Sequence, residues 1–119
     1  MKRTITIDGI PVEMKCTGAT PSFYRDIFKR DLFIEFAKLS NSFKDGIENM
    51  DFSVVENLAY TMAYQANREI GSKLEWLDQF DHSSAIYDAM EDILALYTDG
   101  LQTISVAKKK SDRPSDLSQ

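Results

Sequence analysis

Apolar and polar residues alternate along the first sixteen positions of the chain. The alternation runs from Thr4 to Ile7 and, after Asp8-Gly9, from Ile10 to Cys16. A period of two is typical of a strand with one buried face, and Asp-Gly supplies the positive φ angles of a two-residue turn. The pattern predicts a β-hairpin over residues 3–16. Pro11 has no N–H to donate, so the return strand is expected to lie at a sheet edge there.

From residue 20 the period changes to that of a helix. Thr20 followed by Pro21 is typical of a helix start, with Thr20 as the N-cap. Apolar residues then fall three and four positions apart, and Asp31 is placed to cap a second helix. The pattern leaves open whether residues 21–40 form one helix or two. Residues 41–49 are polar and predict a connector.

Two capping-box spacings follow, Ser53 with Glu56 and Ser72 with Glu75. The helix after Ser53 has the clearest pattern in the chain, a narrow and alanine-rich apolar stripe that permits close helix packing. The residues of this stripe are Val55, Leu58, Ala59, Met62, Ala63 and Ala66.

A last helix is predicted to carry apolar residues from Ile86 to Tyr97. Ser83 or Ser84 is expected to cap it, and Gly100 stands where helices often end.

Together these elements predict an α+β fold that is mainly α. A hairpin packs on about four to five helices within residues 21–100, in a single domain spanning 1–107. Residues 108–119 are basic and offer almost nothing able to pack, so they are predicted to form a disordered tail.

Charge is unevenly distributed in this acidic chain of 119 residues and net charge −5. Residues 1–44 hold 8 basic and 5 acidic groups, residues 45–107 hold 2 and 12, and the tail holds 4 and 2. Such a polarised chain can steer basic partners, or copies of itself, to its acidic half, although acidic helix faces are also simply solvated. The net charge argues against non-specific binding to nucleic acid. No segment approaches the length of a membrane span or a signal peptide, so we expect a cytoplasmic protein.

Candidate chemistry is sparse. One histidine excludes sites that need two from the same chain, and one cysteine excludes an internal disulfide. His82 lies in the cluster Asp78–Ser84, whose spacing matches no ligand or catalytic motif. Cys16 is interpreted as a packing residue, and the acidic side chains around Asp88 lack the loop of a calcium site. We therefore predict no catalytic, cofactor or metal site, and binding instead of catalysis.

Four aromatic residues are the candidate partner contacts. Tyrosine and tryptophan bury a large area yet tolerate water, which favours them at protein interfaces. Packing at the edge of the core is the alternative interpretation. The four residues are Tyr60, Tyr64, Trp76 and Tyr87.

The order of features resembles the tail assembly chaperones of long-tailed phages and prophages of Gram-positive bacteria. The resemblance spans nearly the whole region predicted to be ordered, although each piece alone is weak. Lys29 departs from it, since a helix-breaking glycine is expected there. The matching segments are Ile5-Thr6-Ile7-Asp8-Gly9, Ala19-Thr20-Pro21-Ser22-Phe23-Tyr24-Arg25, Phe28-Lys29-Arg30-Asp31-Leu32, Glu56-Asn57-Leu58-Ala59-Tyr60-Thr61-Met62-Ala63 and Glu75-Trp76-Leu77-Asp78-Gln79-Phe80.

The resemblance implies a non-enzymatic protein of the host cytoplasm that is not expected in the mature virion. Its partners would be the tape measure protein, which it keeps soluble, and the tail-tube protein, which it helps recruit. Self-association is compatible with the polarised charge. Two alternatives remain: an acidic adaptor or inhibitor that occupies a basic site on another protein, and a small enzyme using the Asp78–Ser84 cluster.

Overall fold

The structure is a computed structural model that describes residues 1–112, without the side chains of Ile47 and of residues 102–112. A β-hairpin precedes a series of helices, so the fold is α+β and mainly α, as predicted. The elements are β1 (Lys2–Ile7), β2 (Ile10–Lys15), α1 (Thr20–Phe28), α2 (Leu32–Asp45), the 3-10 turn η1 (Ile47–Asn49), α3 (Phe52–Ala66), α4 (Lys73–Leu77), α5 (Ala85–Asp88) and α6 (Met90–Asp112).

The hairpin forms as its alternating pattern predicts. Asp8 and Gly9 both have positive φ angles, 53° and 79°, which set up a two-residue turn that matches the twist of the strands. The antiparallel register places Ile5 opposite Val12, and both side chains are buried. The buried face lies on the helices, because β2 packs along α3 while β1 contacts α5 and α6. A two-stranded hairpin needs such cover to be stable.

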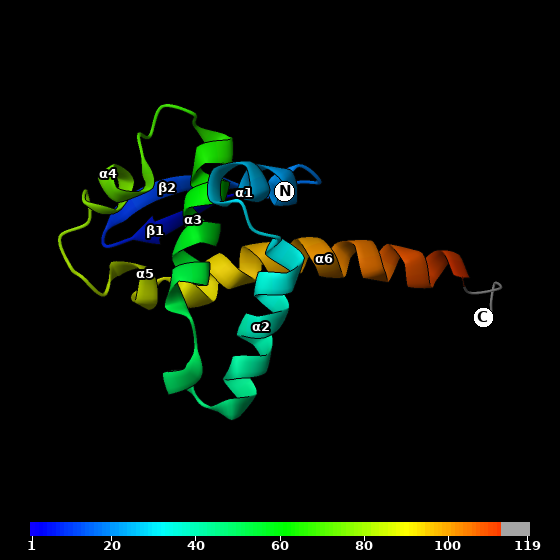
Figure 1. Ribbon diagram of the computed structural model, residues 1–119. Coiled ribbons are helices and arrows are strands. Elements are labelled where there is room, and N and C mark those ends of the chain that lie inside the picture. Colours follow the sequence, from blue (N-terminus) through cyan, green and yellow to red (C-terminus); the bar gives the residue numbers. More distant parts are fainter. Residues whose placement is uncertain (113–119) are drawn as a thin grey trace.

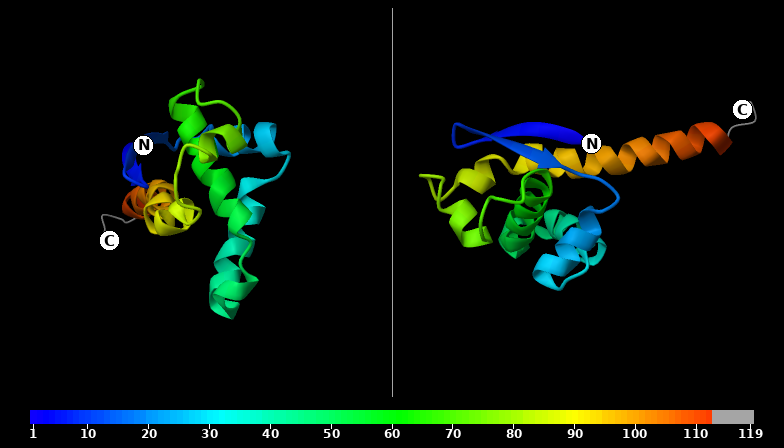
Figure 2. Two further views of the ribbon diagram at one scale, coloured as in Figure 1. Left: turned by 90° about the vertical axis from the view of Figure 1, so that its left-hand side faces the viewer. Right: turned by 90° about the horizontal axis from the view of Figure 1, so that it is seen from above.

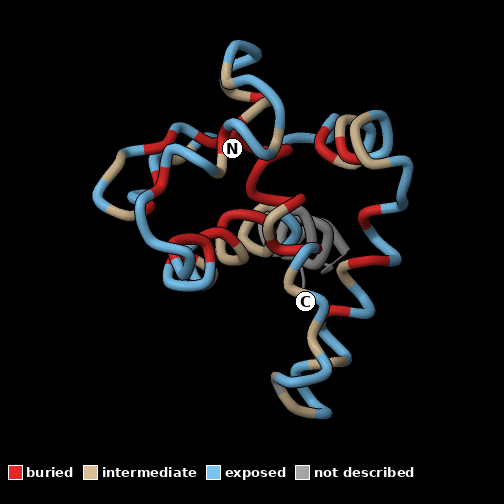
Figure 3. The backbone as a smooth tube through the Cα atoms, turned by 60° about the vertical axis from the view of Figure 1, so that its left-hand side comes forward, coloured by how far each residue is buried: buried red, intermediate tan, exposed pale blue. Residues whose placement is uncertain are grey.

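Helix α3 stands at the centre of the fold, with the hairpin on one side and α1 and α2 on another (Figure 1). Five of the six residues of the predicted apolar stripe are buried, and Ala66 is partly exposed. Burial on α3 extends beyond this narrow stripe. Polar side chains on the other faces of α3 are buried too, including those of Asn57, Thr61 and Gln65. Figure 3 shows buried backbone along this central helix and exposed backbone at the outer turns. Neighbours on several sides, rather than on one, explain the wide burial.

Residues 21–40 form two helices. The break lies at Lys29, whose φ of 59° is left-handed and whose N–H donates to Arg25 O at 2.8 Å. Asp31 then caps α2 by accepting from Ile34 N at 3.1 Å, which confirms its predicted role. A residue other than glycine therefore adopts the helix-ending conformation that the resemblance assigned to glycine.

Two predicted caps are wrong because the side chains have other partners. Thr20 is the first residue of α1, after Ala19 at the N-cap, and its buried hydroxyl donates instead to Gln65 Oε1 at 2.7 Å. The cap of α3 is Asp51, which accepts from the amide of Ser53.

The capping box of Ser72 and Glu75 is confirmed in full at the start of α4, since each side chain accepts from the other residue's backbone N–H. Residues 41–49 are not a simple connector, because α2 continues to Asp45.

The last predicted helix is interrupted and longer than expected. The N–H of Ala89 is shared between the carbonyls of Ala85 and Ile86, at 3.2 Å each, which separates α5 from α6. Neither candidate serine caps it through its side chain: Ser84 occupies the N-cap position, but its hydroxyl donates to Asp88. The predicted end at Gly100 is wrong, since α6 runs on to Asp112.

The helical backbone therefore includes residues 108–112, and residues 113–119, the rest of the predicted tail, lie outside the described residues. In Figures 1 and 2 the last turns of α6 extend away from the other elements. None of the described helices combines the length and apolar character needed to cross a membrane.

Candidate functional site

Large apolar side chains are exposed around an apolar pocket where the open end of the hairpin meets α2 and α6. Phe33 and Leu101 stand at this pocket and are 56% and 39% exposed. Its volume is about 370 Å³. We call it the α2–α6 pocket, and its lining residues are Met1, Cys16, Thr17, Gly18, Pro21, Phe33, Tyr97, Gly100 and Leu101.

Gly100 and Tyr97 line the pocket on the side of α6. Gly100 has no side chain, and a Cβ built there would lie 4.0 Å from Cys16 Sγ. Tyr97 packs edge-on against Phe36 of α2, with ring centroids 4.7 Å apart. Its hydroxyl is buried and has no hydrogen-bond partner among the described residues. Burial raises the pKa of Tyr97 to about 12, so the phenol is neutral.

Cys16 lies on the wall of the pocket and is half-buried. Burial raises the pKa of its thiol, and a hydrogen bond with Thr20 opposes the rise only in part. A thiol with a raised pKa is a poor nucleophile at neutral pH, because the thiolate is the reactive form. This fits the interpretation of Cys16 as a packing residue.

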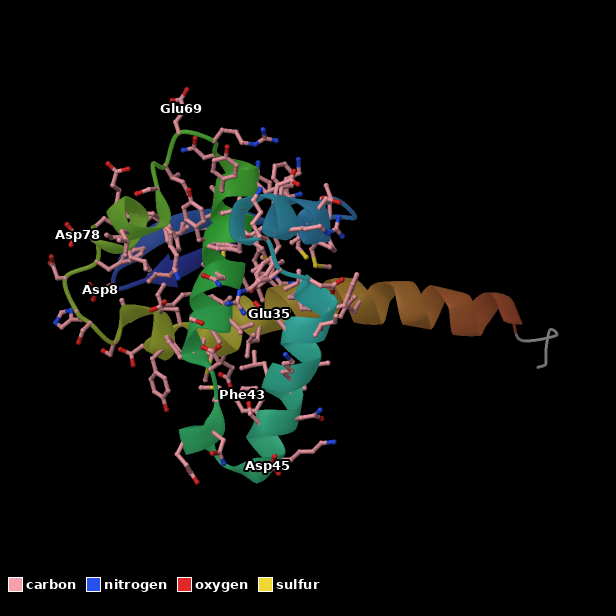
Figure 4. All side chains as sticks on the ribbon, in the orientation of Figure 1. Asp8, Glu35, Phe43, Asp45, Glu69 and Asp78 are labelled. Carbon is pink, nitrogen blue, oxygen red and sulfur yellow. The ribbon has the colours of Figure 1, made fainter. Side chains whose placement is uncertain are left out.

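A buried polar network holds α2 against α1. Tyr24 OH donates to Glu35 Oε1 at 2.6 Å, and Arg30 Nη1 donates to Glu35 Oε2 at 3.0 Å. On α3, Asn57 Oδ1 accepts from Lys73 Nζ at 2.7 Å. Burial, followed by the Glu35 hydrogen bond, raises the pKa of Tyr24 far above its ordinary value. Figure 4 shows Glu35 near the centre of the molecule and Phe43 toward the far end of α2.

The Asp78–Ser84 cluster is joined to the tip of the hairpin. His82 Nδ1 lies 2.8 Å from Asp8 Oδ1, and the amides of Asp81 and His82 donate to Asp8 Oδ2. The His82 side chain is 75% exposed. In the described part of the chain, no group of three or more His, Cys, Asp or Glu side chains could hold a metal ion. This geometry ties the loop that carries His82 to the turn of the hairpin.

The four predicted partner contacts occupy different environments. Tyr60 and Trp76 are 5% and 3% exposed, with rings 5.8 Å apart, and the Tyr60 hydroxyl donates to Gly71 O. Tyr64 is half-buried and stacks on Tyr60, while Tyr87 is 49% exposed beside Phe52. Burial leaves Tyr60 and Trp76 little surface for a partner. Partner contact by Tyr64 and Tyr87 stays a prediction.

The sequence pattern did not single out Phe33 or Leu101 as partner contacts. A usable signal was present in the run Leu32-Phe33-Ile34. Three consecutive helical residues point in three directions about 100° apart, so they cannot all face one core. Leu32 is buried, whereas Phe33 and Ile34 are exposed.

Comparison of the chain with protein-family models, curated proteins and solved structures found no match. The resemblance to tail assembly chaperones therefore rests on the sequence segments alone.

Proposed function

We propose that this protein is a phage tail assembly chaperone that binds apolar helical segments of the tape measure protein, keeps them soluble and helps recruit tail-tube subunits. The observation that carries the proposal is the exposed apolar surface at the α2–α6 pocket. Phe33 and Leu101 present large side chains to solvent there. A pocket between two helices with an apolar rim suits the side chains of an amphipathic helix.

The rest of the surface supports a role in solubility. Ten of the twelve acidic residues in 45–107 are exposed, so a complex with an apolar client would keep a charged exterior. A client that must later be released requires moderate affinity, which a pocket of this size, with one or two anchor positions, can provide. The chaperone then acts by covering apolar helix faces until tube subunits replace it.

The test is co-expression with a tape measure protein. We expect the soluble fraction of the tape measure protein to rise several-fold when this chain is present, and the two proteins to co-purify. A tape measure protein that is equally soluble with and without this chain would overturn the proposal. The His82→Ala variant is the matched control: it should retain full activity, whereas an enzyme using the Asp78–Ser84 cluster would lose it.

The exposed acidic residues also favour the second candidate function, an acidic adaptor or inhibitor of a basic site. Salt separates the two candidates. Binding through exposed charges weakens steeply between about 0.05 and 0.5 M salt, because the Debye length falls to a few ångströms. Binding of an apolar helix persists over this range, so the salt dependence of the complex decides between the two.

A further inference from the structure

Strand β2 has one unpaired edge. Its only strand partner in the described part of the chain is β1. Next to the strand ends, Met1 and Cys16 exchange both backbone hydrogen bonds, at 2.7 and 2.8 Å. Bonded and non-bonded pairs alternate in an antiparallel ladder. The register then directs the backbone groups of every second residue of β2 away from β1. These residues are Pro11, Glu13 and Lys15.

The outward-facing groups are available for pairing. Among the described residues, no hydrogen bond reaches the amide of Glu13 or of Lys15. Pro11 has no N–H. Because its backbone groups face away from β1, the missing N–H removes no hydrogen bond from the β1–β2 ladder. The edge therefore offers both a donor and an acceptor at Glu13 and at Lys15, and only an acceptor at Pro11.

A groove of about 660 Å³ runs along this edge. Four consecutive residues of β2, Ile10–Glu13, line it. Side chains of alternate residues point to opposite faces of a sheet, so a hollow that touches all four must lie at the edge. The floor includes Ala63 and Ala66 from the end of α3, and the wall includes Ile70 and Trp76. Figure 1 shows α4, which carries Trp76, beside the turn end of β2.

The shape and charge of the groove define what can fill it. An added strand lies about 4.8 Å from β2, and small alanine side chains below it leave room for a backbone. Three charged residues line the groove: Lys2 and Glu13, which pair at 3.8 Å, and Glu75. Glu75 is exposed, and its carboxylate faces no basic partner in the described part of the chain. The groove thus favours an extended backbone with a basic or neutral side chain near Glu75.

We propose that the free edge of β2 binds an extended segment of a partner polypeptide, which adds to the hairpin as a third strand over Ala63 and Ala66. The guest pairs with Glu13 within the groove and with Lys15 beyond it along the same edge, and the missing N–H of Pro11 ends the pairing. Apolar guest side chains pack on the half-buried Ile70, and a lysine or arginine faces Glu75. This site is separate from the α2–α6 pocket and does not depend on the proposed chaperone function.

The experiment uses the full chain and a synthetic eight-residue peptide in which valine alternates with threonine and lysine. Amide hydrogen exchange is measured by NMR with and without the peptide. At saturation, exchange at Glu13 and Lys15 should slow at least tenfold, whereas Val12 and Met14, already bonded to β1, should change little. No protection at Glu13 and Lys15 up to millimolar peptide, or shifts confined to the α2–α6 pocket, would overturn the proposal.

Two further comparisons test the geometry. N-methylation of alternate peptide residues should weaken binding at least tenfold in one frame and leave the other frame unchanged, since only one set of N–H groups faces β2. Equal binding in both frames would overturn the proposal. Ala66→Leu should fill the floor and weaken binding at least tenfold, whereas Ala37→Leu, on the exposed face of α2, should not. If Ala66→Leu fails to fold, the N-methylated peptides with the unaltered chain decide the question.

Discussion

The hydroxyl of Tyr24 in α1 donates a hydrogen bond of 2.6 Å to Glu35 Oε1 in α2, and both side chains are buried. The two helices are separated only by the left-handed turn at Lys29, so this bond ties the orientation of α2 to that of α1. Phe33 lies two residues before Glu35 on the same helix. The Tyr24–Glu35 bond therefore helps to position the rim of the α2–α6 pocket.

Removal of the Tyr24 hydroxyl should destabilise the protein. Tyr24→Phe leaves a buried carboxylate oxygen without its donor, and a hydrogen bond to a charged group contributes about 1.5–3 kcal/mol. We expect the free energy of unfolding, measured by urea denaturation, to fall by about that amount. A change within about 0.5 kcal/mol would mean that water or another side chain replaces the hydroxyl.

Tyr97→Phe, in contrast, should not destabilise the protein. Its hydroxyl is also buried but has no hydrogen-bond partner among the described residues, so Tyr97→Phe removes a group whose desolvation is not compensated. We expect unchanged stability or a gain of up to about 1 kcal/mol. Urea denaturation alongside Tyr24→Phe provides the matched comparison. A loss as large as that of Tyr24→Phe would show that the Tyr97 hydroxyl has a partner.

Glycine at position 29 should stabilise the turn between α1 and α2. Lys29 has a φ of 59°, a conformation that costs residues with a Cβ about 1–2 kcal/mol. Part of the gain is offset by the greater freedom of glycine in the unfolded chain. We expect Lys29→Gly to increase the free energy of unfolding by roughly 0.5–1 kcal/mol, which thermal denaturation would detect as a higher melting temperature. Lys38→Gly, at an exposed position inside α2, should lower stability by about 1 kcal/mol. Two changes of the same sign would contradict the argument.

The Asp8–His82 pair should make stability depend on pH. The hydrogen bond to Asp8 raises the pKa of His82 above its ordinary 6.5, and Asp81 and Asp88 add to the rise. The hydrogen bond to His82 lowers the pKa of Asp8 below 3.8. The His82 contribution is complete below pH 6.5 and is lost as pH rises through the raised value. The Asp8 contribution is complete above pH 3.8 and is lost as pH falls through the lowered value.

The pair therefore stabilises the fold most between about pH 4 and 6.5. We expect the melting temperature of the unaltered chain to exceed that of His82→Ala at about pH 5.5, and the difference to shrink by about pH 9. The control is Ser83→Ala, one residue away, which should follow the unaltered chain at every pH. A difference that does not vary with pH would show that His82 acts through packing alone.

Polar substitution at Phe33 should weaken client binding without affecting the fold. Phe33 lines the α2–α6 pocket, whereas its neighbour Ile34 is equally exposed, at 57%, and does not. Phe33→Ser should reduce the soluble fraction of co-expressed tape measure protein several-fold, and Ile34→Ser should reduce it less. Both variants should keep their stability within about 0.5 kcal/mol. If the two substitutions reduce the soluble fraction equally, the α2–α6 pocket does not bind the client.

Features that depend on neighbours in the chain were predictable from the sequence. The hairpin follows from alternation around Asp8-Gly9, and the capping box of Ser72 and Glu75 follows from their spacing. Predictions from the sequence were wrong where a residue distant in the chain bonded to the same side chain. The sequence pattern predicts Thr20 as an N-cap, yet its hydroxyl donates to Gln65, forty-five residues away. Gly100 reads as a helix end, but packing of the hairpin against α6 favours continued helix there.

The candidate site was less predictable than the fold. The sequence pattern left open whether Tyr60 and Trp76 contact a partner or pack at the edge of the core. Both are buried, with Tyr60 on α3 and Trp76 on α4 packed against each other. Exposure of Phe33 depends on which of three consecutive apolar residues faces the body, and the orientation of α2 decides this. The resemblance to tail assembly chaperones suggested a partner without indicating where it binds.

The sequence by itself determined the hairpin, the capping box of α4 and the order of strands before helices, because strand alternation, turn residues and helix caps act over a few residues. It also determined the absence of a paired-histidine site and the acidic character of residues 45–107. Only the tertiary structure decided that Tyr24 reaches Glu35, that Asp8 holds the His82 loop, and that β2 keeps a free edge beside Ala63 and Ala66. These relationships join residues that no local pattern connects. Their free energy comes from burial and desolvation, which exist only once the helices and the hairpin are packed together.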